Sequence, residues 1–335
     1  MAGIGAKFLD IIDMEKSKNP DGSVADVIEM LMELNPFMKD GYAVRCNNGT
    51  KHRTTVRTGL PSVAWGALYK GITQSKSSKA QVEDVTGFVE GLSTVDCRLM
   101  HLEQNRGAAR LSEAKAYMEA MEQEVQEKLI YGNNTTAPNE LMGLAPRFSD
   151  MSAPSGKQIV DGEGVGSDNT SIWFVTWGDN QCHMIYPDGN GIQSGIQRED
   201  MGKQRVLDGD NNPYYAEEEL FTHHIGLTVR DWRYVVRIAN IDVSEALAGN
   251  VALYDLLRKA YYQHFGRRTG FKGKSVIYMN TDMLEVLDTL ATNAGASDSF
   301  VRMTPMQIQG EEVMSYRGIP IREVDALLNT EAVVS

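Results

Sequence analysis

Residues 51–71, KHRTTVRTGLPSVAWGALYKG, are the stretch of sequence that says most about the fold. They alternate as a strand does, and Gly59-Leu60-Pro61 interrupts the alternation. The wider segment from Gly41 to Val82 contains seven Lys or Arg and no Asp or Glu. A ribbon of this length is not stable alone in water, so we expect it to lie against a partner surface.

The charge of this segment is opposite to that of the rest of the chain. The formal net charge is −12, so a segment that carries +7 leaves −19 on the other 293 residues. Such a separation of charge is typical of an arm that binds an acidic surface. That surface could be nucleic acid, a membrane or another copy of the same protein.

The composition indicates a soluble, cytoplasmic protein. The chain has 335 residues, of which 42% are hydrophobic and 23% charged, which is ordinary for a globular protein with two subdomains or one elaborate domain. Its apolar runs are far shorter than the roughly 20 residues of a membrane span, and the N-terminus lacks a signal core. Three cysteines without a short pairing suit free thiols in a reducing compartment. A pI near 5.1 argues against a main surface that binds duplex DNA.

Helical periodicity predicts two helices in the first 131 residues. A short helix is expected over residues 24–34 and ends before Pro36, because the residue that precedes a proline avoids the α region. A much longer helix is expected over residues 93–131, where Ser93 or Thr94 can cap it and residues 105–107 break or kink it.

The long helix has two different faces. Glu113, Glu124 and Glu127 fall together on one face and make it acidic. We therefore expect the helix to hide its apolar side within the subunit and to offer its acidic side elsewhere. The apolar stripe has helical spacing: Leu111, Ala114, Met118, Met121, Val125 and Leu129.

Strands are expected in the middle of the chain. Residues 171–178 and 182–187 are predicted to form a hairpin around residues 178–180. The polar segment 187–218 is interpreted as a long excursion of the chain that connects two strand regions. Residues 225–241 are predicted to form a half-buried strand.

An α/β subdomain of modest size is expected after residue 242. It consists of a helix over residues 250–265, a strand over 275–279, a helix that begins at Thr281 or Asp282 and ends at residue 294, and a last strand within 318–328.

The candidate metal motifs are weak. Asp208, Asp210, Asn212 and Glu219 have the spacing of a calcium loop, but Pro213 stands where the sharp turn of such a loop needs glycine. An acidic surface loop is the better interpretation.

A zinc site at the histidines is also weakly supported. His223 and His224 are neighbours in a predicted strand and point to opposite faces, while Cys182 and His183 lack the spacing of metal ligands. The sequence shows neither a P-loop nor a nucleophile elbow. We therefore expect no catalytic residues, no metal and no cofactor, and we predict that the protein is not an enzyme.

The order of the elements resembles a known family of structural proteins. The segments that carry the resemblance are, in chain order, NPFMKDGYAVRCNNGTKHRTTVRTGLPSVAWGALYKGITQSKSS, VDCRLMHLEQNRGAARLSEAKAYMEAMEQEVQEKLIYGN, GLAPRF, HHIGLTVRDWRYVVRIANI, SVIYMNTDMLEVL and YRGIPIREVDALLNTEA. They are similar to the major capsid proteins of short-tailed double-stranded DNA phages, and most closely to the epsilon-15-like group.

The resemblance implies an α+β fold of the Hong Kong 97 phage capsid type. Its parts would be an N-terminal arm (residues 1–40), an extended E-loop (41–92), a peripheral domain (93–241) with a long spine helix (93–131), an axial domain (242–316) and a return strand (317–335).

The same resemblance implies that the basic arm lies on a neighbouring copy. Cations of the arm would meet carboxylates of the long helix, while apolar side chains such as Val63 and Leu68, with Trp65 as anchor, would supply most of the contact energy. The interface residues expected on this basis are Lys51, Arg53, Arg57, Leu60, Trp65, Tyr69, Lys70, Glu113, Glu124 and Glu127.

The resemblance also implies partners and a place of assembly. The chain would form hexamers and pentamers of a virion shell in the host cytoplasm, together with a portal and a decoration or cement protein. An acidic inner wall would enclose double-stranded DNA without binding it specifically. Some family members join subunits through a Lys–Asn bond, for which Lys70, Lys76 or Lys79 could serve as donor, although loop lysines are common.

Two alternatives remain at this stage. An encapsulin-like shell around protein cargo has the same fold, and a metal-dependent enzyme could be built on His183, His223 and His224.

Overall fold

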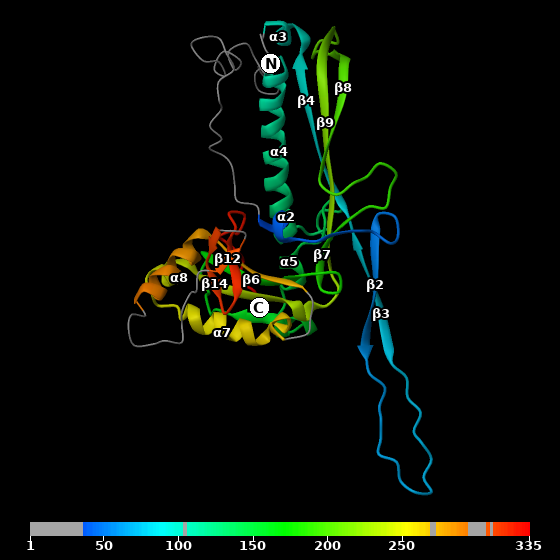
Figure 1. The fold of residues 1–335 in the computed structure, drawn as a ribbon, viewed down its shortest axis with the longest axis vertical. Coiled ribbons are helices and arrows are strands. Elements are labelled where there is room, and N and C mark those ends of the chain that lie inside the picture. Colours follow the sequence, from blue (N-terminus) through cyan, green and yellow to red (C-terminus); the bar gives the residue numbers. More distant parts are fainter. Residues whose placement is uncertain (1–35, 103–105, 269–272, 294–305, 309–310) are drawn as a thin grey trace.

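The computed structural model describes residues 36–102, 106–268, 273–293, 306–308 and 311–335. The helix expected over residues 24–34, and the expected N-terminal arm up to residue 35, lie outside this part of the chain. A lobe of sheet and short helices carries a long helix and a strand ribbon at one side, and a hairpin projects from it in the opposite direction (Figure 1).

A mixed sheet forms the centre of the lobe. Two strands run antiparallel to β6 on its two sides, and all nine residues of β6 are buried, so both faces of the sheet are covered. The strands are, in spatial order, β5 (Ile159–Asp161), β10 (Val235–Asp242), β6 (Asn169–Trp177), β11 (Lys274–Met279), β15 (Ile319–Glu323) and β14 (Ser315–Tyr316).

Helices cover the two faces of this sheet with separate apolar clusters. On one face, Phe174 and Ile277 pack in a cluster with Leu257 and Leu287 of two amphipathic helices. On the other face, Trp173 and Tyr278 share a cluster with the end of the long helix. The helices around the lobe are α2 (Pro36–Asp40), α5 (Leu144–Arg147), α6 (Val243–Leu247), α7 (Leu253–Gln263) and α8 (Thr281–Asn293), with single 3-10 turns at Pro154–Gln158, Trp232–Tyr234 and Phe265–Arg267.

A three-stranded antiparallel ribbon lies beside the long helix α4 (Arg106–Tyr131). Its central strand is β9 (Pro213–Val229), flanked by β4 (Gly87–Asp96) and β8 (Ile196–Leu207). Further along, β9 also pairs with β7 (Cys182–Tyr186), which in turn pairs with β1 (Ala43–Arg45). The strand β9 therefore joins the ribbon to the central lobe.

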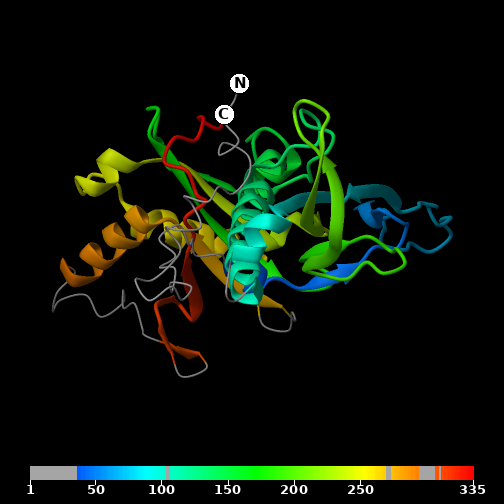
Figure 2. The same ribbon diagram turned by 90° about the horizontal axis from the view of Figure 1, so that it is seen from above.

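The basic segment of the sequence forms an antiparallel hairpin. Its strands β2 (Lys51–Gly59) and β3 (Ser78–Val85) pair from Lys51↔Val85 to Gly59↔Ser78, and residues 60–77 connect them. The hairpin and α8 lie at opposite ends of the molecule when it is seen from above (Figure 2). A separate pair, β12 (Met306–Ile308) and β13 (Glu311–Val313), completes the described strands.

The long helix is confirmed, but it begins later than expected. Ser93 and Thr94 belong to β4 and cannot cap a helix, because β4 continues to Asp96. A short helix, α3 (Cys97–Leu102), comes first, and α4 begins at Arg106. Of the predicted stripe, Leu111 is exposed, whereas the described structure buries Ala114, Met121, Val125 and Leu129.

The expected hairpin of residues 171–187 is wrong. The strands β6 and β7 share only the pair Trp177↔Cys182, because β6 lies between β10 and β11 while β7 pairs with β9. The polar excursion 187–218 contains β8 and the start of β9. The expected strand 225–241 is two strands, separated by the 3-10 turn Trp232–Tyr234, and β10 is buried on both faces rather than half-buried.

The elements after residue 242 are confirmed with slightly different bounds, and β11 begins one residue earlier than the expected strand 275–279. The helix expected over 250–265 is α7, and the last strand is only five residues long. The division of the chain into peripheral and axial domains at residue 242 stays a prediction. The central sheet crosses this boundary, since β6 and β10 precede it and β11 follows it.

Candidate functional site

The loop at the end of the hairpin exposes an unusual amount of apolar surface. Trp65 and Tyr69 are exposed to 102% and 105% of their reference areas, so no described residue covers them. Monomeric soluble proteins rarely expose large apolar groups in one contiguous segment without a partner. The six exposed residues, called the apolar tip from here on, are Leu60, Val63, Trp65, Leu68, Tyr69 and Ile72.

The backbone of the apolar tip is held by few hydrogen bonds. The Ser75 hydroxyl donates to the carbonyl oxygen of Ser62 at 2.6 Å across the loop. Near the end of the loop, the amide of Lys70 donates to the carbonyl oxygen of Ala67 at 3.2 Å, in a turn where Tyr69 has a φ of 63°. The hairpin thus presents the tip on a short ladder that ends at Gly59.

Two of the predicted interface cations already have a partner within the hairpin. Arg53 Nε donates to Glu83 Oε1 at 2.7 Å, and Lys51 Nζ lies 3.7 Å from Glu83 Oε2. The hydrogen bond from Arg53, together with its charge, lowers the pKa of Glu83 below the ordinary value. The expected contacts of Lys51 and Arg53 with another copy stay predictions. In such contacts each side chain would bind a carboxylate of the other copy while it remains paired with Glu83.

Arg57 differs from these two cations. It stands directly opposite Lys79 in the hairpin, a like-charge pair that is destabilising unless an anion joins it. Among the residues that the structure describes, no carboxylate lies within ion-pairing distance of Arg57.

A buried polar joint fixes the base of the hairpin to the lobe. Asp84 of β3 accepts a hydrogen bond of 2.8 Å from Arg147 Nη2 and another from the Thr228 hydroxyl. On β2, His52 Nε2 lies 2.8 Å from Arg230 Nη2. Burial lowers the pKa of His52, and the charge of Arg230 lowers it further.

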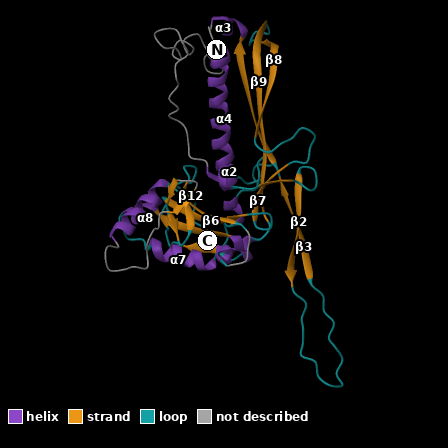
Figure 3. Ribbon diagram, in the orientation of Figure 1, coloured by secondary structure: helices purple, strands orange, loops and turns teal. Residues whose placement is uncertain are grey.

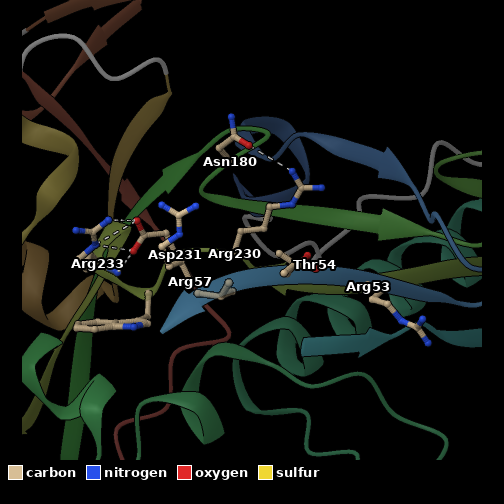
Figure 4. A pocket seen from close by; sticks show the side chains of 10 residues that line it. Arg53, Thr54, Arg57, Asn180, Arg230, Asp231 and Arg233 are labelled. Atoms are coloured by element: carbon tan, nitrogen blue, oxygen red, sulfur yellow. Dashed lines mark hydrogen bonds and ion pairs between the residues drawn. The ribbon is translucent and has the colours of Figure 1, made fainter. Parts of the chain in front are cut away.

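A basic groove lies next to this joint, between β2 and the turn that follows β9 (Figure 4). It encloses a volume of about 710 Å³ and is lined by four arginines. Its carboxylate, Asp231, is already engaged, because Arg233 Nε and Nη2 donate to it at 2.9 and 2.6 Å. Thr54 Oγ1 and Arg230 Nε are buried in the lining without a described partner. The lining arginines are Arg53, Arg57, Arg230 and Arg233.

The predicted acidic residues lie on α4, away from the hairpin. Lys128 Nζ is 3.7 Å from Glu124, 3.4 Å from Glu127 and 3.2 Å from Glu140, so one cation serves three carboxylates. Glu113 is half-buried, and burial raises its pKa. The hairpin points away from α4 (Figures 1 and 3), so the basic and acidic sets are not brought together within one copy.

The described part of the chain contains no cluster of His, Cys, Asp or Glu that could hold a metal ion. Asp208 caps the β8–β9 turn by accepting from the amides of Asp210 and Asn212 at 3.0 and 2.7 Å. Glu219 instead accepts two hydrogen bonds of 2.8 Å from Arg198. No described helix is both long and apolar enough to cross a membrane.

Sequence reasoning missed several residues of the joint and the groove. The count of charges stopped at Val82, one residue before Glu83 and Asp84. Continuing the antiparallel pairing outward from the loop would have placed these carboxylates opposite Arg53 and His52. No local signal in the sequence pointed to Arg230, which reaches His52 from a distant strand end.

The comparisons with known proteins agree with this architecture. A family model described as Major capsid protein GP7 matches residues 19–335. The chain belongs to this family. A solved structure of bacteriophage Epsilon15 is 30% identical in sequence to this capsid protein, with a TM-score of 0.79, and the match covers 100% of this chain and 99% of that one.

More distant structures also match this capsid protein. The SrpI encapsulin of Synechococcus elongatus PCC 7942 is 10% identical over 70% of this chain and 96% of its own, with a TM-score of 0.47. The capsid of phage XM1 is 13% identical over 64% of this chain and 94% of its own, with a TM-score of 0.40. No curated protein matches the chain.

The family assignment gives the chain its function. It is a major capsid protein of a phage, with the Hong Kong 97-like capsid fold, and a structural component of the virion shell. The family model, which describes a major capsid protein and matches residues 19–335, favours the phage capsid over the encapsulin-like alternative.

Proposed function

We propose that the hairpin of residues 51–85 is the arm by which one copy of the capsid protein binds the next. The observation that carries this proposal is the apolar tip, whose large side chains are exposed and are covered by no described residue. A tip that is covered in the shell explains why these residues are tolerated on an otherwise charged surface. Head-to-tail contacts of this kind close into rings, and the rings join into an icosahedral shell.

The apolar tip supplies most of the binding free energy in this proposal. Interfaces depend on a few large anchors, among which tryptophan is enriched, so Trp65 is the principal one. Exposed ion pairs contribute only about 0.2–1 kcal/mol each. The basic side chains therefore orient the arm and speed association more than they add affinity.

Arg57 and Lys70 carry this orienting role more than Lys51 and Arg53 do. Glu83 offsets the charge of the latter two, while Arg57 is paired with Lys79 across the strands and lines the basic groove. The acidic remainder of the next copy, including the α4 carboxylates, is the complementary surface.

The proposed shell encloses a double-stranded DNA genome without binding it specifically. The net charge of −12 supports this, because phosphate binding comes from clustered Lys and Arg, whereas an inner wall with net negative charge does not retain DNA. Assembly in the host cytoplasm, a portal and a decoration protein are further parts of the proposal.

Negative-stain microscopy of the full chain expressed alone tests the role of the arm. The wild type is expected to form shells or capsomer rings, and a Trp65→Ala, Arg57→Glu variant to remain as small species. Thr73→Ala, a small change in the same loop, is the matched control and should assemble as the wild type does. Shells formed equally well by the Trp65→Ala, Arg57→Glu variant would refute the proposal.

A further inference from the structure

A small pocket with an apolar floor lies between β4, α4 and residues 139–141. It encloses about 300 Å³, which is room for one large side chain. The approach of β4 to the 139–141 segment is close, because a Cβ on Gly87 would lie only 2.9 Å from the carbonyl oxygen of Asn139. The close backbone contact between β4 and residues 139–141 therefore fixes these two walls of the pocket. The apolar lining consists of Phe88, Val89, Val125, Leu141 and Ile225.

The rim of this pocket is acidic. Glu90, Glu124 and Glu140 line it, and Lys128 is the single cation among the lining residues. Glu90 and Glu124 are exposed, whereas Lys128 is partly buried and already lies between Glu124, Glu127 and Glu140. The surroundings of the pocket thus retain an excess of negative charge.

The loop at the end of the hairpin has the complementary chemistry. Residues 60–77 contain Lys70 and Lys76 and no Asp or Glu, and their large apolar side chains are exposed. An apolar anchor that enters the pocket would bring the adjacent lysines to the acidic rim.

Two copies of the chain are needed for this contact. The hairpin points away from the ribbon and α4, so the loop of one copy lies far from the pocket of the same copy (Figure 1). We infer that this pocket receives Trp65 of a second copy, with Lys70 of that copy beside the rim carboxylates. The inference rests on the proposed function and names the surface that the arm meets.

Photo-crosslinking in assembled shells tests the inference directly. A benzophenone amino acid in place of Trp65, incorporated at low occupancy beside wild-type subunits, is irradiated in purified shells and mapped by mass spectrometry. Crosslinks are expected to residues 87–90, 124–128 and 139–141 of another copy. Crosslinks to other surfaces of another copy overturn the inference while the proposed role of the arm survives, whereas crosslinks only to a different phage protein overturn both. If the tip forms no crosslinks in intact shells, both fail.

A charge exchange tests the rim separately. Glu124→Lys and Lys70→Glu are each expected to slow assembly by up to about fivefold, and the double variant to recover most of the loss. Glu285→Lys is the matched control, because Glu285 is an exposed carboxylate on another helix, α8, and does not line the pocket. Equal effects of the Glu124 and Glu285 changes, without recovery in the double variant, would contradict the inference.

Discussion

Asp84 and Arg147, which are 63 positions apart in the chain, form an ion pair of 2.8 Å that ties the base of the hairpin to the lobe. The two side chains are exposed to only 6% and 16%, and Arg147 also donates to the carbonyl oxygen of Leu227 at 2.9 Å. The direction in which the hairpin projects is therefore set by a shielded contact rather than by the exposed ladder alone.

Replacing Asp84 by alanine is expected to destabilise the subunit strongly. The change leaves the Arg147 guanidinium buried without its carboxylate, for which the loss is roughly 3–5 kcal/mol. Urea unfolding of the unassembled protein measures it. Glu83→Ala, one residue earlier but in an exposed pair, is the control and should cost about 0.2–1 kcal/mol. Equal losses in the two variants would show that the joint is not a principal support of the hairpin.

Reversing the charge of Arg57 is expected to slow assembly without unfolding the hairpin. A glutamate there faces Lys79 across the strands and forms an attractive pair in place of a repulsive one. Light scattering should show slower growth at low salt and a smaller difference near 1 M salt, where the screening length falls to about 3 Å. Arg57→Gln should lie between the wild type and Arg57→Glu. A difference that does not change with salt would argue against electrostatic orientation.

Lowering the pH from 7 to 5 is expected to destabilise the subunit, in part through His183. Burial lowers the pKa of His183 to about 4, and the charges of Arg230 and His52 act in the same direction, opposed by Asp179. The unfolded chain, with the ordinary value near 6.5, binds more protons in this range, so stability falls as pH decreases from about 6.5 to about 4. Above about pH 7 this contribution is constant.

The urea midpoint at several pH values measures the effect. His183→Asn is expected to reduce the loss between pH 7 and pH 5, whatever its effect on stability at pH 7 itself. The wild type should change little from this cause between pH 7 and pH 8. An unchanged loss in the variant would exclude His183 as a contributor.

The sequence predicted the local features of the exposed hairpin loop but not the long-range contacts at the base of the hairpin. The exposed loop of the hairpin was recognisable because its composition, apolar and basic without carboxylates, is a property of one continuous stretch. The partners Arg147 and Arg230 come from other parts of the chain, and only the fold brings them to Asp84 and His52. The strand β8 was missed because its twelve residues have no buried member, so hydrophobic alternation could not reveal it.

The start of the long helix was misplaced for a related physical reason. Ser93 and Thr94 are good caps in isolation, but β4 continues through them because it pairs with β9 up to Asp96↔Ala216. The turn at residues 178–180 was predicted correctly. The strands on its two sides do not form a hairpin, because β6 pairs with β10 and β11, while β7 pairs with β9. Tertiary pairing, which the sequence does not display locally, decided both cases.

Removing the carboxylate of Glu331 is expected to release the C-terminal segment from the lobe. Glu331 accepts hydrogen bonds from Arg237 at 2.8 Å, from Tyr131 at 2.5 Å and from the Ser171 hydroxyl, so it joins the end of α4 to the central sheet. Glu331→Ala leaves the Arg237 guanidinium, only 4% exposed, without a carboxylate, which should cost roughly 3–5 kcal/mol in urea unfolding. Val333→Ala, an exposed position in the same segment, should change stability by less than about 0.5 kcal/mol. Similar midpoints for the two variants would show that the segment is held by its backbone contacts instead.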